Sequence, residues 1–271
     1  MNRKNQIVNC FHFGLQAIFL YLTFSFLRAL LHELGHGLAA TLVGLEFQGL
    51  YASVFGSSGA WINGARSSFQ SVVISSAGPM VDLVIGLIAL FVILPGMKKW
   101  DSRLSWLFIA ATTLVSFWGL MMSTGFGAGD FANVAHALEM PKYVFGVLGI
   151  FGLITFLFLL GKRMLTISSP YFVYDSFGQR FKIIFLFLGL PALISVVGYA
   201  LLTHKYVILG QALFVIGMMA LVTIFIRSSS KNEFPLPKSM TYVGAAAFFV
   251  SCLVWLTVFG TTIQKAKGLF W

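Results

Sequence analysis

The feature that most constrains this chain is a series of apolar runs, each about as long as a membrane is thick. Seven runs of mostly apolar residues follow one another, covering approximately 13–45, 71–94, 104–122, 143–160, 183–202, 206–226 and 242–259. A helix that crosses a bilayer needs roughly 20 such residues, because its backbone polar groups must be satisfied within the helix itself. We therefore predict an all-α polytopic membrane protein with about six to seven transmembrane helices.

The composition excludes the other broad classes of protein. Of the 271 residues, 58% are hydrophobic and only 10% are charged, whereas soluble domains carry about a quarter charged residues. The net charge of +10 comes from Lys and Arg that lie mostly in short connections between apolar runs, where such residues set membrane orientation. We expect the lipid bilayer as the surrounding partner, no nucleic acid as a ligand, and a multi-pass location in a plasma or inner membrane.

The connections between the runs are too short to hold an independent soluble domain. We predict a single integral membrane domain over 1–271, with a catalytic core over 13–142 and additional helices over 143–271. The first run would be roughly 50 Å long as a helix, so it must tilt, protrude or break near Gly35 or Gly37. Pro191 is expected to kink the fifth run. Two short apolar and aromatic stretches around a glycine-serine turn predict a β-hairpin over 46–63.

One cluster of ionisable residues lies inside the first run and points to chemistry. The sequence His32-Glu33-Leu34-Gly35-His36 places His32 and His36 four residues apart, on one face of a helix. Two imidazoles in this arrangement can bind one Zn²⁺, while Glu33 can serve as the general base of peptide hydrolysis. Ionisable groups in lipid are costly, so a function is the better interpretation than a buried polar cluster.

A catalytic zinc site uses three protein ligands, and the sequence offers three candidates for the third. Asp82, Asp130 and His136 all come within reach of membrane depth. If the histidines lie toward the far end of the first helix, the third run returns to that same face just before Asp130, while Asp82 lies about 16 Å into the second run. Asp130 can equally be the N-cap of a short helix over 131–138.

Three segments together resemble the site-2 protease family of intramembrane zinc metalloproteases, closest to its compact branch without extra soluble domains. They are the 32–37 segment late in an apolar helix, the 77–82 segment Ala-Gly-Pro-Met-Val-Asp that opens the next helix, and an Asp-led segment at Asp130. The resemblance covers about residues 20–142. It implies Zn²⁺ bound by His32, His36 and Asp130, Glu33 as the catalytic base, and a β-rich membrane-associated loop at 46–63. It also directs attention to four residues that contact substrate or support the ligands, namely Gly78, Pro79, Asp82 and Asn133.

The sequence departs from the family pattern at three places. Asp82 stands where relatives carry Asn, a glycine-rich segment over 125–129 replaces a proline-rich one, and Phe131 stands where Gly is common. Orientation is also open. The distribution of Lys and Arg predicts a cytosolic N-terminus and places the zinc motif toward the outside, whereas relatives generally place the motif toward the cytosol.

The predicted function is zinc-dependent hydrolysis of peptide bonds in membrane-embedded or membrane-proximal substrates, which are membrane proteins or peptides. Two alternatives from other classes stay open. One is a catalytically inactive membrane protein that binds client transmembrane helices, favoured by Phe131 and the altered glycine-rich segment. The other is an ion- or proton-translocating protein, although the ionisable residues gather at one face rather than crossing the bilayer.

Overall fold

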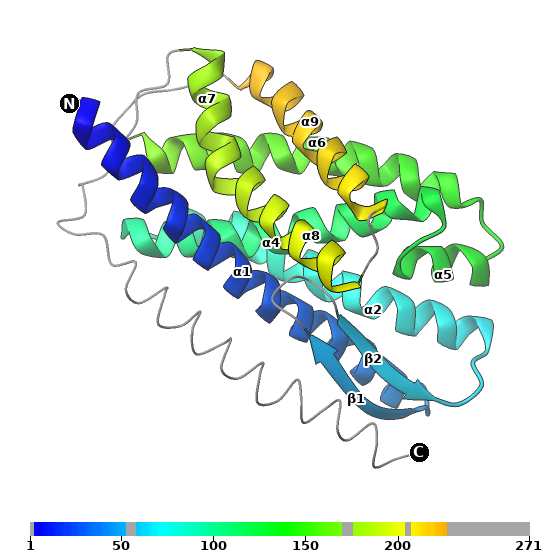
Figure 1. The fold of residues 1–271 in the computed structure, drawn as a ribbon. Coiled ribbons are helices and arrows are strands. Elements are labelled where there is room, and N and C mark those ends of the chain that lie inside the picture. The colour runs from blue at the N-terminus through cyan, green and yellow to red at the C-terminus, as the bar shows by residue number, and fades with distance from the viewer. Residues whose placement is uncertain (1–2, 53–57, 170–175, 204–206, 227–271) are drawn as a thin grey trace.

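The computed structural model describes residues 3–52, 58–169, 176–203 and 207–226. Within these ranges the chain is mostly helical (Figure 1), with a single pair of strands directly after the first helix. The α-helices are α1 (Arg3–Leu42), α2 (Ser68–Leu87), α3 (Leu94–Gly96), α4 (Trp100–Ser123), α5 (Asp130–Ala137), α6 (Lys142–Ser168), α7 (Phe177–Ile184), α8 (Leu190–Thr203) and α9 (Val207–Phe225). Two π-helical turns, η1 (Ile88–Ile93) and η3 (Phe185–Gly189), and the 3₁₀ turn η2 (Thr124–Phe126) interrupt or extend these helices.

Five helical segments of the described chain are long and apolar enough to cross a membrane. They are Gly14–Leu42, Ser68–Gly96, Ser102–Phe126, Lys142–Ser168 and Phe177–Val197. They confirm the predicted all-α class with several membrane-spanning helices. The sixth predicted run forms the apolar helix α9, and the seventh, 242–259, lies outside the described residues.

Helix α1 is continuous over 40 residues, so among the three alternatives for the first run, namely tilting, protruding or breaking near Gly35 or Gly37, the break is excluded. Both glycines instead allow another element to approach the helix. A Cβ at Gly35 would lie 3.2 Å from the Cα of Gly78 on α2, and a Cβ at Gly37 would lie 2.6 Å from the ring of Phe47. Because these two glycines have no side chains, α2 and the hairpin pack directly against α1.

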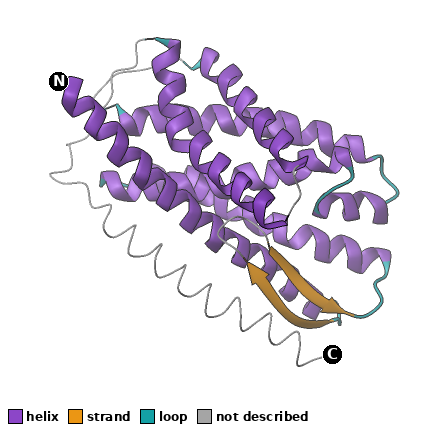
Figure 2. Cartoon of the chain, in the orientation of Figure 1, coloured by secondary structure: helices purple, strands orange, loops and turns teal. Residues whose placement is uncertain are grey.

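The predicted hairpin is confirmed by an antiparallel pair of strands, β1 (Glu46–Ala52) and β2 (Ser58–Asn63), shown as orange arrows in Figure 2. Its register runs from Glu46 opposite Asn63 to Ala52 opposite Ser58, with an irregularity between Phe47 and Gly49. The hairpin follows α1 after the three residues 43–45, in which Gly44 has φ +82°, a left-handed conformation that glycine adopts without strain.

The two π-helical turns each lie just ahead of a proline, Pro95 and Pro191. Proline has no amide hydrogen to donate and its ring crowds the preceding turn, so the helix widens locally rather than continuing regularly. The irregularity that the sequence predicts at Pro191 is therefore present as η3, two residues before that proline.

Helix α4 lies at the centre of the bundle and brings the next segment to the site. Its segment Ser102–Phe126 is the most enclosed of the five candidate spans, because 56% of its most apolar stretch is buried. Leu104, Leu107, Phe108 and Leu114 belong to the main hydrophobic core. The chain leaves α4 through η2 and turns back as α5, which lies in Figure 1 at the same end of the bundle as the hairpin and the start of α2.

Candidate metal centre and catalytic site

Two histidines on one face of α1 form the base of the candidate site. His32 and His36 are 4% and 7% exposed, and their Nε2 atoms lie 3.1 Å apart. The helical spacing of four residues produces this convergence, because side chains four residues apart lie one above the other on the same face.

Asp130 on α5 completes a group of three possible metal ligands. One carboxylate oxygen, Oδ2, lies 3.1 Å from His32 Nε2, and the other, Oδ1, lies 3.6 Å from His36 Nε2. One ligand atom from each of the three residues lies within 4.8 Å of the other two. Two imidazole nitrogens and one carboxylate oxygen are a donor set that suits catalytic zinc and leaves a coordination position free, so these residues fit such an ion.

Asp130 is not the helix cap that the sequence allowed as an alternative. It is the first residue of α5, the N-cap position belongs to Gly129, and no side chain makes a capping hydrogen bond there. Burial acts to raise the pKa of Asp130, but the hydrogen bonds and positive charge of His32 and His36 outweigh burial and lower that pKa below its usual range. The carboxylate is therefore ionised and available as a ligand.

Phe131, one of the departures from the family pattern, fixes the helix that carries Asp130. Its side chain is 3% exposed and lies between Phe117 of α4 and Phe145 of α6, with ring centroids 5.5 Å and 5.6 Å away. Aromatic pairs at this separation add to the energy of burial. The bulky side chain of Phe131 thus anchors α5 against two neighbouring helices.

The other ring nitrogen of each histidine, Nδ1, forms a hydrogen bond with a neighbouring group of the protein. His36 Nδ1 lies 2.6 Å from the backbone carbonyl oxygen of Ile74, which requires Nδ1–H to donate. His32 Nδ1 lies 2.9 Å from Asp82 Oδ2, and a carboxylate accepts in the same way. With both Nδ1 atoms protonated and held in this way, a metal ion that displaces the Nε2 protons would find both Nε2 lone pairs beside the Asp130 carboxylate, an arrangement typical of histidines that ligate metals.

Asp82 therefore lies behind His32, on the opposite side of the ring from Asp130. Its carboxylate is fully buried and also accepts a hydrogen bond of 3.1 Å from Arg28 Nη1. Arg28 donates to Ser116 of α4 as well, and its positive charge balances the negative charge of Asp82. Arg28 was not predicted to belong to the site, although its spacing of four residues before His32 is the signal that it shares the histidine face.

Glu33 contacts the hairpin. It is 5% exposed, and its Oε1 accepts a hydrogen bond of 2.7 Å from Ser58 Oγ at the start of β2. This contact joins the candidate base to the strand. Sequence analysis did not find Ser58 as a partner of Glu33, because 25 residues and a turn separate the two.

Gly78 and Pro79 lie on α2, where this helix passes the histidines. A Cβ at Gly78 would lie 2.5 Å from His36 Nε2 and 2.8 Å from His32 Nε2. Glycine thus leaves open the space directly beside both nitrogens. Pro79 is buried and removes one backbone donor from this turn of α2. Asn133, in contrast, is exposed on α5 one turn beyond Asp130 and lines a neighbouring polar pocket with His136.

Replacement of Gly78 by alanine tests whether this space is needed for a metal. We expect Gly78→Ala to lose most bound zinc, because the added methyl group would overlap the position of the histidine nitrogens. Gly119→Ala on α4 is the matched control, since a Cβ there meets no atom within 4 Å and should leave the zinc content unchanged. Metal analysis of the two purified proteins provides the measurement, and equal zinc in both would contradict the assignment of this space.

The fold and the site together indicate a class of protein. A bundle of apolar helices that brings together two histidines of a His-Glu-x-x-His motif and a distal aspartate has the features of a membrane metallopeptidase family. A model of the Peptidase M50B-like family matches residues 7–129, which include all but the first four residues of α1, the hairpin, α2 and α4. This match confirms the resemblance to the site-2 protease family, and it ends one residue before Asp130. The chain has no significant match among curated proteins or among solved structures.

Proposed function

We propose that this chain is an intramembrane zinc metalloprotease that hydrolyses peptide bonds of membrane-embedded or membrane-proximal substrates. The observation that carries the proposal is the convergence of His32, His36 and Asp130, from segments 98 residues apart, next to a buried glutamate on the same helix. His32, His36 and Asp130 would hold Zn²⁺. The five candidate spans support a multi-pass location in a plasma or inner membrane.

The residues of the chain perform distinct parts of the reaction. When bound, zinc would polarise the scissile carbonyl and stabilise the negative charge that develops on its oxygen. Glu33 accepts a proton from the attacking water at its carboxylate and delivers it to the nitrogen of the leaving amine. Ser58 holds that carboxylate through its hydroxyl hydrogen. Asp82 and the Ile74 carbonyl keep the two imidazoles in one tautomer and orientation.

A substrate helix satisfies its own backbone hydrogen bonds, so it must unwind before its carbonyl can be attacked. Strand β2 begins at Ser58, beside Glu33, and in the described chain the sheet has only the two strands β1 and β2. The edge of β2 that does not face β1 can pair with an extended peptide, as sheet edges do in many peptide-binding proteins. The hairpin therefore offers a place to hold the unwound segment next to the base.

Metal removal tests the proposed function directly. We expect the purified protein in lipid nanodiscs to cleave a model transmembrane substrate, to stop after treatment with a chelator, and to recover on addition of zinc. A second substrate with two glycines in its span should be cleaved faster, because unwinding costs less. Gel analysis of the products gives the rates. Cleavage that survives complete zinc removal would overturn the proposal, and equal rates for both substrates would point to a peptide outside the membrane.

A further inference from the structure

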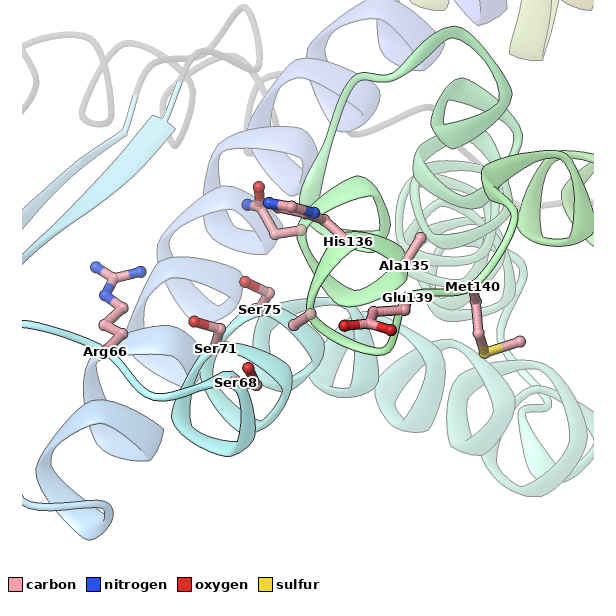
Figure 3. Close-up of a pocket in the computed structure, with 10 residues that line it drawn as sticks. Arg66, Ser68, Ser71, Ser75, Ala135, His136, Glu139 and Met140 are labelled. Atoms are coloured by element: carbon pink, nitrogen blue, oxygen red, sulfur yellow. The ribbon is translucent and has the colours of Figure 1, made fainter.

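A polar pocket lies beside the candidate metal centre, between the first half of α2 and helix α5 (Figure 3). It has a volume of about 580 Å³. Polar side chains dominate its walls, among them Arg66, Ser68, Ser71, Ser75, His136 and Glu139. Such a lining suits a polar occupant, because its side chains can form hydrogen bonds with polar groups.

The pocket and the metal centre share one face of α2. Ser68, Ser71 and Ser75 are spaced by three and four residues, and Gly78 and Asp82 continue the same spacing. Residues at this spacing lie in one stripe along a helix. The stripe thus leads from the beginning of α2, through the serines, to the glycine beside the histidine nitrogens and to the aspartate behind His32.

The opposite wall of the pocket connects to the metal centre in the same way. Asn133 and His136 follow Asp130 by three and six residues on α5. Ser75, which is only 5% exposed, directly follows Ile74, whose carbonyl holds His36. On both walls, therefore, residues that line the pocket lie about one helical turn from residues that form or hold the metal ligands.

We propose that this pocket binds a polar flank of the peptide substrate, on the side of the scissile bond that lies toward the beginning of α2. The inference rests on the proposed protease function and specifies its substrate class: membrane peptides in which the cleaved bond adjoins a hydrophilic segment, rather than spans that are apolar throughout. Hydroxyl groups supply hydrogen bonds to an extended backbone, and burial of polar peptide groups without such bonds is unfavourable.

Arg66 gives the pocket a charge preference at a definable distance from the cleaved bond. Ten residues of α2 separate Ser68 from Gly78, which is roughly 15 Å along a helix. An extended peptide covers that length in about five residues at roughly 3.3 Å each. Arg66 lies two residues before this helix, is exposed, and suits a carboxylate. The acidic Glu139 also lines the pocket, but in the view of Figure 3 it lies on the other side of the three serines from Arg66. We therefore expect preferred substrates to carry an acidic side chain about five residues from the cleaved bond, where it can pair with Arg66.

Charge reversal tests the pocket. Two model substrates differ only by Asp or Lys at the fifth residue from the cleaved bond. We expect kcat/KM to be about two- to fivefold higher for the Asp substrate, as for an exposed ion pair. Arg66→Glu should reverse this preference, and Arg66→Gln should remove it. Lys142→Glu, which reverses an exposed charge outside the pocket, should keep it. An unchanged preference in both Arg66 variants would overturn the inference.

Binding measurements separate a failure of the pocket from a failure of the protease. Fluorescently labelled Asp and Lys peptides are titrated against the Glu33→Gln protein and against the same protein with Arg66→Glu, and anisotropy reports the affinities. A preference that reverses between the two proteins supports the pocket, even if the unmodified chain cleaves nothing and the protease function fails. Equal affinities for both peptides in both proteins overturn the pocket, whether or not cleavage occurs.

Discussion

Replacement of Glu33 by glutamine is expected to abolish peptide-bond cleavage while zinc binding and the fold persist. The amide keeps the size of the side chain and can still accept the hydrogen bond from Ser58, but it cannot take a proton from water. Loss of a general base typically slows a reaction by about 100- to 10,000-fold. Product analysis with the model transmembrane substrate measures the rate, and metal analysis on the same preparation measures zinc.

Glu46→Gln is the matched control for this experiment. Glu46 begins β1, is exposed, and contacts Asn63 across the hairpin, so the same chemical change is made in the same part of the chain. It should leave the rate within about twofold, since exposed substitutions of this kind change stability little. Full activity of Glu33→Gln would exclude Glu33 as the base.

Replacement of Asp130 by asparagine should cause the second large effect, the loss of zinc and of activity together. Asp130 supplies the only carboxylate oxygens beside the two Nε2 atoms in the described chain, and asparagine removes its charge. Groups that only support a ligand typically contribute about 10- to 100-fold to metal affinity, so the loss at a ligand should be larger. Competition with a chromogenic chelator measures the affinity.

The Asp82→Asn variant distinguishes a metal ligand from a residue that only holds a ligand in place. We expect a decrease of about 10- to 100-fold in zinc affinity, smaller than for Asp130→Asn. Part of that decrease comes from Arg28, whose buried charge loses its partner. The double variant Arg28→Met with Asp82→Asn removes both charges, and it should bind zinc more tightly than Asp82→Asn alone. A greater loss of zinc in Asp82→Asn than in Asp130→Asn would reverse the assignment.

Local patterns were sufficient to predict the helices, the hairpin and the two histidines. Apolar length predicts a spanning helix, and a spacing of four residues places His32 and His36 together whatever the rest of the chain does. A break in α1 was one of three alternatives that the sequence left open, and it does not occur because Gly35 and Gly37 have a role that a single helix does not reveal. They provide contact surfaces for α2 and Phe47, which depend on the tertiary arrangement.

The rest of the site depends on contacts between distant segments. Periodicity left Asp82, Asp130 and His136 as alternatives. Asp130 was favoured by the order of the runs, which returns the chain to the histidine face just before this residue, and by the resemblance to a family. Neither source indicated that Arg28 neutralises Asp82 or that Ser58 holds Glu33, because each pair joins two elements whose relative position is set by packing. Asn133 was predicted to contact substrate or support the ligands, and the structure places it in the polar pocket one turn from Asp130.

The distance along the chain between His32 and Asp130 has a consequence for the biogenesis of the protein. The two residues meet at 3.1 Å but are separated by 98 positions, so a ribosome working at about 5–20 residues per second needs about 5–20 seconds to pass from one to the other. Throughout that interval the nascent chain carries both histidines and Glu33 without the third ligand. The donor set is complete only after α4 has been made and α5 has turned back against α1 and α2. Under the proposed function, proteolytic capacity thus arises only in a chain whose central helices have already been synthesised and packed, which protects the membrane-insertion machinery and neighbouring nascent helices from premature cleavage.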